Sequence, residues 1–206
     1  LPLKNISPSI EMIEAVALAL QELREEVVFV GGATLPFYME IGSSEKIRPT
    51  DDVDIIIEIA NRTDYYSLEE NLRSKGFINS TEAKDPICRW KINQVTVDIM
   101  PTDPSILGFT NKWYEEGSEY AVKIQLPSKM DIYIFSLPYF IASKIEAFIG
   151  RGKGEFRFST DIEDIVSVID ALSSLEEIKK APDNVKVYLI EKMSNFLGND
   201  LFMESL

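Results

Sequence analysis

The chain has 206 residues, of which 45% are apolar and 27% are charged, and it carries a formal net charge of −13. This length suits one large domain or two small ones, and the apolar content is sufficient for a buried core. The negative charge opposes nonspecific binding to a nucleic-acid backbone and suits a cationic or protein partner better, although a local basic patch could still bind RNA.

The residue types that are missing narrow the chemistry further. The chain has no histidine and a single cysteine, Cys88. These counts exclude Ser-His and Cys-His catalytic pairs, HExxH zinc sites, an intrachain disulfide and any multi-cysteine metal cluster. We expect Cys88 to be a small buried residue and not a nucleophile. Because the sequence shows neither a secretory signal nor an apolar run that could span a bilayer, we expect a cytoplasmic protein with no membrane partner.

The first third of the chain is predicted to form a helix, a strand, a second helix and a second strand. Apolar residues recur at every third or fourth position in the first helix, whereas short continuous apolar runs mark the strands. Gly42 ends the second helix, and a polar loop with Pro49 leads into the second strand. The predicted elements are the helix at residues 10–23, the strand at 27–30, the helix at 33–41, the loop at 42–50 and the strand at 53–59.

The rest of the chain is predicted to add short strands and then helices. A turn precedes the next helix, which Gly76 closes, and prolines and glycines interrupt residues 101–129, where we expect a short helix and another strand pair. The predicted elements are the turn at residues 61–65, the helix at 66–75, strands at 77–81, 88–92 and 94–100, and helices at 137–149, 161–172, 175–180 and 183–196. A mixed sheet followed by helices is an α+β arrangement or two small domains.

A pair of glycines, Gly31 and Gly32, follows the first predicted strand and opens the next helix. Glycine permits close backbone approach, and the N-terminus of a helix offers free N–H groups to a phosphate. Taken alone, the pair favours a plain strand-to-helix turn, and it lacks the GxGxxG spacing of a Rossmann site.

Three carboxylates are candidates for binding a divalent cation. Asp52 and Asp54 lie one residue apart in a predicted strand, so their side chains point to the same face, whereas Asp51 points to the opposite face. Asp98 lies in a second, apolar strand, where a lone carboxylate is costly to bury without a partner. Convergent carboxylates are typical of a site in which Mg²⁺ also holds substrate phosphates. Two alternatives stay open: an exposed strand edge for Asp52 and Asp54, and a core Asp98 paired with an Arg or a Lys.

The order of these motifs resembles that of the nucleotidyltransferase superfamily that includes DNA polymerase beta. The superfamily pattern is a hydrophobic residue before Gly-Gly or Gly-Ser, then Asp-x-Asp, then an Asp within a later strand. In this chain the pattern reads Phe29-Val30-Gly31-Gly32, Asp52-Val53-Asp54 and Val97-Asp98-Ile99. One departure is Ala33-Thr34 after the glycines, where many members place a serine directly in the turn.

Within this superfamily, further segments resemble the AbiEii/AbiGii-type toxins of abortive-infection systems. One segment is similar to the Arg-x-Thr-x-Asp-h-Asp element of those toxins: it reads Arg48-Pro49-Thr50-Asp51-Asp52-Val53-Asp54. Two later segments are similar to motifs in the helical half of those toxins. They are Lys144-Ile145-Glu146-Ala147-Phe148 and Thr160-Asp161-Ile162-Glu163-Asp164. The resemblance spans about residues 25–170.

The resemblance implies a fold, a metal site and a nucleotide site. The fold would be an α+β nucleotidyltransferase-type mixed sheet with flanking helices at residues 1–130, followed by a helical half at 131–206 that completes the cleft. Two Mg²⁺ or Mn²⁺ ions would be bound: Asp52 and Asp54 would bridge them, and Asp98 would bind the second ion and take the proton from an acceptor hydroxyl. Nucleotide binding is implied for Gly31, Gly32, Thr34, Arg48, Lys144, Asp161 and Asp164.

The motifs of the helical half each have a structural alternative. Lys144 lies at the margin of an apolar helix face, so it is either a solvated surface lysine or, as the resemblance implies, a catalytic cation that faces the triphosphate. Thr160 and Glu163 match a capping box, which predicts that Glu163 caps the helix. Asp161 and Asp164 share one helical face, and they either favour the positive helix N-terminus or take part in the cleft.

Two further features favour structural roles. One is a glycine-rich segment, Gly150-Arg151-Gly152-Lys153-Gly154, which lacks the spacing of a phosphate-binding loop. It is predicted to be a flexible connector in which Gly150 ends a helix. Arg151 and Lys153 could still help to bind an anionic substrate. The aromatic residues Trp90, Trp113 and Tyr114 are predicted to be core or interface residues.

The sequence therefore predicts the transfer of a nucleoside monophosphate from a nucleoside triphosphate to an acceptor hydroxyl, with release of pyrophosphate. One hypothesis is an AbiEii-like toxin that acts on RNA or protein and has an antitoxin partner. A second is a small-molecule nucleotidyltransferase of the antibiotic-resistance kind, since the acidic surface suits a cationic aminoglycoside. A third is an inactive fold kept as a binding module, which the intact Asp52, Asp54 and Asp98 argue against.

Overall fold

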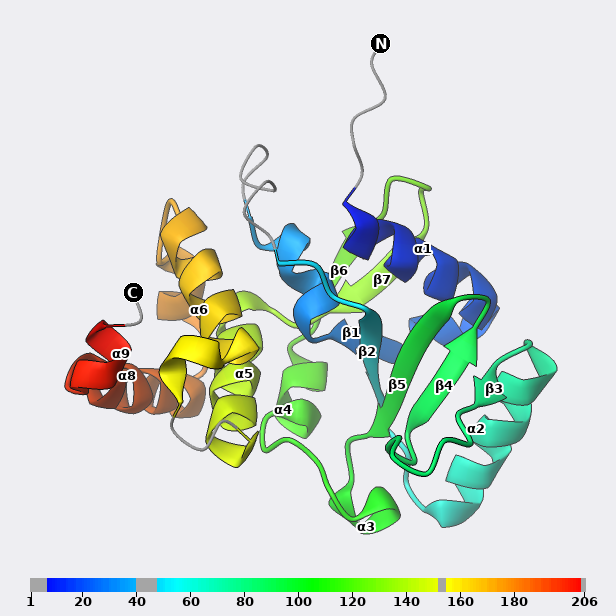
Figure 1. Ribbon diagram of the computed structural model, residues 1–206. Helices are drawn as coiled ribbons and strands as arrows, with labels where there is room; N and C mark the ends of the chain where they lie inside the picture. Colours follow the sequence, from blue (N-terminus) through cyan, green and yellow to red (C-terminus); the bar gives the residue numbers. More distant parts are fainter. Residues whose placement is uncertain (1–6, 40–47, 152–154, 205–206) are drawn as a thin grey trace.

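A mixed sheet forms the centre of the molecule. The computed structural model describes residues 7–39, 48–151 and 155–204, and its strands follow the order β3-β4-β5-β2-β1-β7-β6 (Figure 1). The strands are β1 (Val27–Val30), β2 (Asp52–Ile57), β3 (Ile78–Asn79), β4 (Arg89–Ile92), β5 (Val95–Pro101), β6 (Val122–Gln125) and β7 (Asp131–Ile134). The inner strand β2 runs antiparallel to β1 and parallel to β5, while β4 runs antiparallel to β5.

Helices cover both faces of this sheet, and the later ones gather on one side of the molecule. The α-helices are α1 (Pro8–Leu20), α2 (Arg62–Ser74), α3 (Pro104–Leu107), α4 (Tyr114–Glu119), α5 (Leu137–Arg151), α6 (Thr160–Ala171), α7 (Glu176–Lys180), α8 (Asp183–Leu197) and α9 (Asp200–Met203). The 3₁₀ helices are η1 (Gln21–Glu25), η2 (Gly32–Phe37) and η4 (Phe156–Phe158). Figure 1 shows α5, α6, α8 and α9 on the opposite side of the central strands from α1 and α2.

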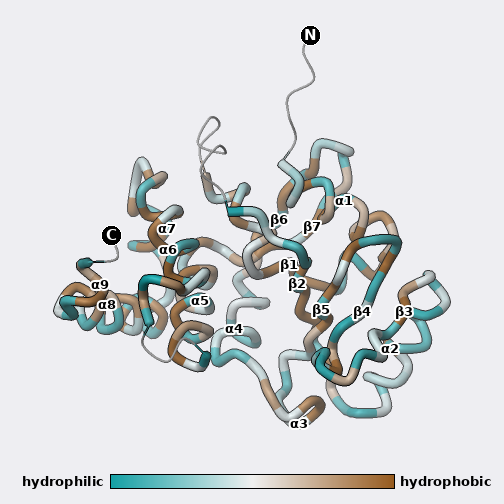
Figure 2. The backbone as a smooth tube through the Cα atoms, in the orientation of Figure 1, coloured by the Kyte–Doolittle hydropathy of each residue, from teal (hydrophilic) through white to brown (hydrophobic). Residues whose placement is uncertain are grey.

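The central strands contribute alternate residues to two cores, because successive side chains of a strand point to opposite faces. Val27 and Phe29 pack in the core that includes α1 and α2, whereas Val28 and Val30 pack in the core that includes α5, α6 and α8. Figure 2 shows hydrophobic segments along β2, β5, α5 and α6. In β2, Val53 packs in the core that includes α1 and α2. The neighbouring residues Asp52 and Asp54 therefore face the helical half.

The predicted α+β fold, a mixed sheet with flanking helices followed by a helical half, is confirmed. The predicted division after residue 130 stays a prediction, but β7 is hydrogen-bonded between β1 and β6, so the sheet itself extends to Ile134. The segment 101–129 holds α3, α4 and β6, and the strand partner of β6 begins only at Asp131. Within the described ranges, every helix is too short or too polar to cross a bilayer.

Several predicted boundaries are wrong for identifiable reasons. The predicted helix at 33–41 is a 3₁₀ helix that ends at Phe37, and Pro36 within it cannot donate a backbone hydrogen bond. The end of that prediction, including Gly42, lies outside the described residues. The predicted turn at 61–65 is instead the start of α2, because the Asn61 side chain accepts hydrogen bonds from the N–H groups of Thr63 and Asp64.

The first helix also departs from the prediction. Apolar spacing predicts a helix over 10–23, but α1 starts at Pro8 and ends at Leu20. Gln21 has a φ of 56°, which the α-helix does not accommodate, and the chain continues as the 3₁₀ helix η1. Leu23 remains buried, so the apolar period marks burial correctly while the backbone changes its hydrogen-bonding pattern.

Candidate functional site

The candidate site starts from a row of residues across three neighbouring strands. Asp54 of β2 lies opposite Asp98 of β5, and Asp98 lies opposite Arg89 of β4. The intervening residues Val97 and Trp90 pack in the core on the α1 side, so the row faces the helical half. The strand pairing therefore brings two of the predicted carboxylates and one unpredicted guanidinium together.

The glycine turn comes close to the Asp54 end of this row. Val30, the last residue of β1, is the partner of Asp54 across the sheet. Gly31 has a φ of 74°, and a Cβ at this position would collide with Asp54 Oδ2. Glycine is therefore required here both by the backbone conformation and by the close approach of the carboxylate.

Gly32 and Thr34 are buried behind this turn. A Cβ at Gly32 would lie 3.4 Å from both Arg48 Nη2 and Asp164 Oδ2. The Thr34 side chain is fully buried, and its hydroxyl donates a hydrogen bond to the Gly31 carbonyl oxygen at 2.8 Å. These positions suit a role in shaping the turn, and the phosphate contacts predicted for Gly32 and Thr34 stay predictions.

Asp54 carries an unbalanced charge. Within the described ranges, its carboxylate has no hydrogen-bond or ion-pair partner. Burial, together with the charges of Asp52 and Asp98, raises the pKa of Asp54 to about 7, and Lys144 and Arg151 oppose this shift. Such a carboxylate is stabilised by any cation that enters the site.

Asp98 differs from Asp54 because Arg89 binds both of its oxygens. Arg89 Nε lies 2.8 Å from Asp98 Oδ1, and Nη2 lies 2.7 Å from Oδ2. The same Nη2 lies 3.6 Å from Asp52 Oδ2, and Nη1 lies 3.7 Å from Asp85 Oδ1. Thr50 donates a hydrogen bond to Asp52 Oδ1 at 3.0 Å. The alternative in which Asp98 is paired with an arginine therefore fits this geometry.

Sequence reasoning missed Arg89, although the signal was present. The predicted strands at 88–92 and 94–100 are close enough to form a tight hairpin, and Asn93 at the turn has a φ of 53°. Ile92 pairs with Val95 across this turn, and counting outward from that pair brings Arg89 opposite Asp98. The hairpin register would have identified the partner.

A second cluster of charges joins α5 to α6. Lys144 Nζ lies 2.6 Å from Asp164 Oδ2 and 3.2 Å from Asp161 Oδ1. Lys144, Asp161 and Asp164 are 7%, 2% and 1% exposed, so Lys144 is not the solvated surface lysine of the structural alternative. Its ammonium group is buried and faces two carboxylates, which a lysine in this setting requires.

Two arginines complete this second cluster. Arg151 donates from Nε to Asp161 Oδ2 at 3.1 Å and from Nη2 to Asp161 Oδ1 at 3.0 Å. Arg48 Nη2 lies 3.8 Å from Asp164 Oδ2, and Arg48 Nε lies 3.9 Å from Glu163 Oε2. Arg48 precedes β2, so this contact connects the sheet to α6. We name Lys144, Asp161, Asp164, Arg151, Arg48 and Glu163 the helical cluster.

Two predictions about this region are wrong. The capping box of Thr160 and Glu163 is not formed, because the cap is Ser159, whose Oγ accepts a hydrogen bond from the Ile162 N–H at 3.3 Å. Thr160 is the first residue of α6 instead. Gly150 does not end its helix, because α5 extends through Arg151. Residues 152–154 of the predicted connector lie outside the described residues.

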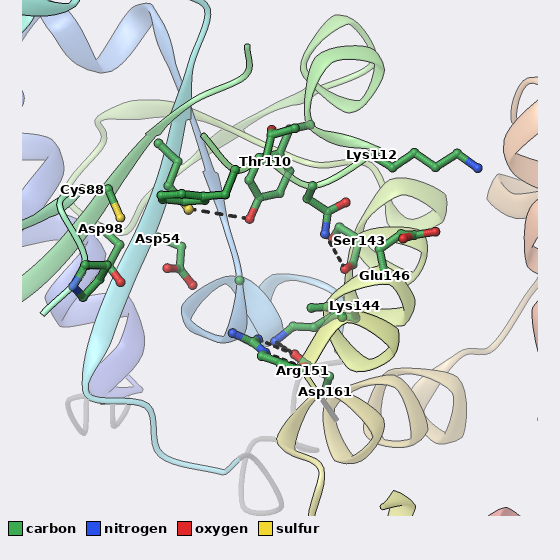
Figure 3. Close-up of a pocket in the computed structure, with 18 residues that line it drawn as sticks. Asp54, Cys88, Asp98, Thr110, Lys112, Ser143, Lys144, Glu146, Arg151 and Asp161 are labelled. Carbon is green, nitrogen blue, oxygen red and sulfur yellow. Dashed lines mark hydrogen bonds and ion pairs between the residues drawn. The ribbon is translucent and has the colours of Figure 1, made fainter. Parts of the chain in front are cut away.

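The two groups of charges face each other across a pocket of about 560 Å³ (Figure 3). Of the predicted site residues, those that line this pocket are Gly31, Asp54, Asp98, Lys144 and Asp161. Those that do not line it are Gly32, Thr34, Arg48, Asp52 and Asp164. Arg151 lines the pocket as well, so the sheet side offers carboxylates, and the helical side offers the cations Lys144 and Arg151 beside Asp161 and Glu146.

The remainder of the pocket lining is mixed: it includes Met100, Phe109 and Tyr114 as well as the charged residues Lys112 and Glu146. Burial and the charge of Asp54 raise the pKa of Tyr114, so its hydroxyl stays protonated. Burial and the charge of Asp98 raise the pKa of Cys88 to about 12, which makes this thiol a poor nucleophile. Trp90 and Trp113 are core residues, as the sequence predicts.

The carboxylates around Asp54 have the chemistry of divalent-ion ligands, and the predicted metal site stays a prediction. Among the described residues, no group of three His, Cys, Asp or Glu side chains is arranged to hold a metal ion. Mg²⁺ commonly uses one or two carboxylates together with substrate phosphates, and Asp54 with Asp52 can supply these. Asp98 already has a guanidinium on both oxygens.

Comparisons with known proteins agree with the fold. No protein-family model and no curated protein matches the chain. One similar solved structure is an antigenic nucleotidyltransferase-like protein from Paracoccidioides brasiliensis, with 19% identity, a TM-score of 0.55, and coverage of 93% of this chain and 92% of that chain. Another is the antibiotic-resistance factor ANT(2'')-Ia, with 13% identity, a TM-score of 0.53, and coverage of 92% and 95%. The AbiEii/AbiGii-type resemblance stays a prediction, and the chain has the fold of nucleotidyltransferase-like proteins.

Proposed function

We propose that the protein is a metal-dependent nucleotidyltransferase that transfers a nucleoside monophosphate from a nucleoside triphosphate to an acceptor hydroxyl. The observation that carries this proposal is Asp54, which has no partner in the part of the chain that the structure describes and faces Lys144 and Arg151 across a pocket of about 560 Å³. An anionic triphosphate with its metal ion would satisfy both walls at once. The nucleotidyltransferase-like fold supports the same reaction.

The chain's own residues would divide the work of binding the triphosphate. Gly31 has no side chain, which allows the Asp54 carboxylate to lie against the backbone at the pocket. Lys144 and Arg151 would attract the phosphate oxygens, and Asp161 holds both cations in position. These cations are fixed before the nucleotide arrives, which lowers the cost of ordering them on binding.

Asp54 and Asp52 would hold a divalent ion, Mg²⁺ or Mn²⁺. When bound there, the ion would supply Lewis-acid stabilisation of the charge that develops on the phosphoryl oxygens. Asp98 would accept a hydrogen bond from the acceptor hydroxyl and take its proton, because a carboxylate has about four lone-pair sites and Arg89 uses two of them. Arg89 would thereby orient the base.

The acceptor is proposed to be RNA or protein, with an antitoxin as a partner and the cytoplasm as the place of action. The support is the helical cluster, because Lys144, Asp161 and Asp164 are the residues that resemble AbiEii-type motifs and they lie together beside the pocket. A second candidate acceptor is a small cationic molecule. The net charge of −13 and the likeness to an antibiotic-resistance factor favour it.

The proposal is tested by incubating the protein with Mg²⁺ or Mn²⁺ and each nucleoside triphosphate labelled at the α-phosphate. One set of reactions contains a cell extract, and a second set contains a panel of aminoglycosides. The variant Asp54→Asn should lose transfer, whereas Asp51→Asn removes the same charge from an exposed neighbour and should retain it. Label in RNA or protein supports the toxin-like acceptor, and label in an aminoglycoside supports the alternative. Nucleotide binding without transfer to any acceptor would identify an inactive binding module.

A further inference from the structure

Arg89 lies among several carboxylates at one end of the sheet. Its guanidinium contacts Asp98 through two hydrogen bonds, and it also lies 3.6 Å from Asp52 and 3.7 Å from Asp85. Arg89 is therefore the cation that three of the carboxylates at this end of the sheet share. Asp54, in the same row of residues, is left without a partner among the described residues.

This arrangement is fixed by the backbone and not by a flexible surface contact. Arg89 and Asp98 are direct partners in the antiparallel pairing of β4 with β5. The side chain of Asp98 is 11% exposed and that of Arg89 is 25% exposed. A guanidinium stays charged at any pH at which proteins fold, and its planar fork matches both oxygens of a carboxylate. The pair is consequently part of the folded site.

Arg89 does not balance the carboxylates around it. Asp52, Asp54, Asp85 and Asp98 carry four negative charges when ionised and Arg89 carries one positive charge, so a negative charge remains that a divalent ion would reduce. Asp54 is the carboxylate of this group without a cation within the described ranges. A second ion at Asp98 would have to displace the guanidinium and leave it in a poorly hydrated position, which is costly for a buried charge.

We propose that Arg89 takes the place of a second metal ion: its guanidinium occupies both oxygens of Asp98, so that the site binds one divalent ion, through Asp54 and Asp52, instead of two. This inference rests on the proposed function, because it assigns a stoichiometry to the proposed metal site. Arg89 is a positioning residue in this scheme, because it acts on the reaction through Asp98.

The inference is tested by counting Mn²⁺ ions, because Mn²⁺ is detected directly by electron paramagnetic resonance. The protein is titrated with Mn²⁺ alone and again with a saturating nonhydrolysable nucleoside triphosphate, with the signal of the protein-free nucleotide complex subtracted. The wild-type protein should bind one ion in the ternary complex. Arg89→Gln should bind two, with the second ion at least about tenfold tighter than any second ion on the wild type.

Two variants make this count interpretable. Lys91 lies on the same face of β4 as Arg89, but it contacts Glu82 instead of Asp98. The variant Lys91→Gln should therefore still bind one ion. Glutamine at position 89 can still donate one hydrogen bond to Asp98, which protects the fold. The double variant Arg89→Gln/Asp98→Asn should return to one ion, because the second ion then lacks its carboxylate.

Two ions on the wild-type protein, or one ion on a folded Arg89→Gln protein, would overturn the inference and leave the proposed nucleotidyl transfer standing. No bound Mn²⁺ on the wild type, with or without nucleotide, would overturn both. If Arg89→Gln does not fold, the wild-type count still decides, since a second ion on the wild type is incompatible with a resident guanidinium.

Discussion

The two walls of the pocket differ in their balance of positive and negative side chains. In the helical cluster, three cations face three carboxylates within 4 Å, and the innermost residues are almost fully buried. At the sheet, Arg89 is the cation that lies within 4 Å of Asp52, Asp85 and Asp98, and Asp54 adds a fourth carboxylate. The helical cluster is balanced, whereas the sheet has an excess of negative charge.

This difference distinguishes a cluster of charges that stabilises the fold from one that attracts a ligand of opposite charge. A balanced and buried cluster connects elements of the fold, and here it joins α5, α6 and the segment before β2. An unbalanced cluster stores repulsion, which the fold tolerates when a ligand of the opposite charge relieves it. Changes at the helical cluster should therefore act first on stability, and changes at the sheet should act first on transfer.

The largest expected effect is on transfer by Asp98→Asn. The substitution keeps the shape of the side chain but removes the proton acceptor, so the transfer rate should fall by about 10²–10⁴-fold. Nucleotide binding should persist, because Asp54, Lys144 and Arg151 are unchanged. The measurement is single-turnover transfer beside a nucleotide titration on the same variant.

Asp85→Asn is the matched control for Asp98→Asn, because Asp85 also contacts Arg89 but does not line the pocket. It should retain most of the transfer activity. A wild-type rate for Asp98→Asn would show that the base lies elsewhere, and an equal loss in both variants would show that the Arg89 contacts, not proton transfer, set the rate.

The next effect is on stability, at Lys144. Lys144→Met keeps much of the side-chain volume but leaves Asp161 and Asp164 buried without their shared ammonium group, so the free energy of unfolding should fall by about 3–5 kcal/mol. Arg151→Met is the control, because it contacts the same Asp161 but its side chain is 70% exposed. Urea denaturation of both variants checks this difference. Equal losses would mean that burial does not distinguish the two cations.

The sheet was predictable from sequence because a strand repeats every two residues. That period alone puts Asp52 and Asp54 on one face, and the fold confirms that this face looks toward the helical half. Asp98 was recognisable as a carboxylate in need of a partner. The partner itself was not recognised, because Arg89 is determined by the register between two strands and not by the pattern within either one.

The helical half was less predictable because its key contacts join elements distant in sequence. Helical spacing puts Lys144 at the margin of an apolar face, and this position suits a surface lysine. Only α6, packed against α5, supplies the two carboxylates that let Lys144 be buried. A pattern within one helix carries no information about its neighbour. The cap was misassigned by one residue, from Ser159 to Thr160, because both side chains can cap a helix.

A smaller effect, of opposite sign to that of Lys144, is expected at Asp54. The folded protein raises the pKa of Asp54 from 3.8 to about 7, so the folded state binds a proton more tightly than the unfolded state does. Stability from this group is therefore lost as the pH rises from about 4 to about 7. Asp54→Asn removes that loss, and it should raise the free energy of unfolding at about pH 8 by on the order of 1–3 kcal/mol, with little change near about pH 4.

Denaturation of Asp54→Asn in the presence of a chelator, at both pH values, checks this prediction. Asp51→Asn removes a carboxylate from the exposed neighbouring position, and it should change stability little at either pH. A variant that is less stable than the wild type at the higher pH would contradict the view that the sheet side of the pocket stores electrostatic repulsion.

The smallest effect concerns the reactivity of Cys88, which reports the excess negative charge on the sheet side of the pocket. Burial and the charge of Asp98 raise the pKa of this thiol to about 12, so very little thiolate is present at neutral pH. Alkylation should be roughly 10³-fold slower in the folded protein than in denaturant, where the thiol regains an ordinary pKa of about 8.5. Cys88 lines the pocket but is only 2% exposed, so restricted access also slows the reaction, and the comparison of variants isolates the effect of charge. Asp98→Asn removes the charge that raises the pKa of Cys88 most, so it should speed alkylation of the folded protein, whereas Asp85→Asn should not. Equal rates in these two variants would mean that burial alone protects the thiol, and the contrast between an unbalanced sheet and a balanced helical cluster would then lack its most direct probe.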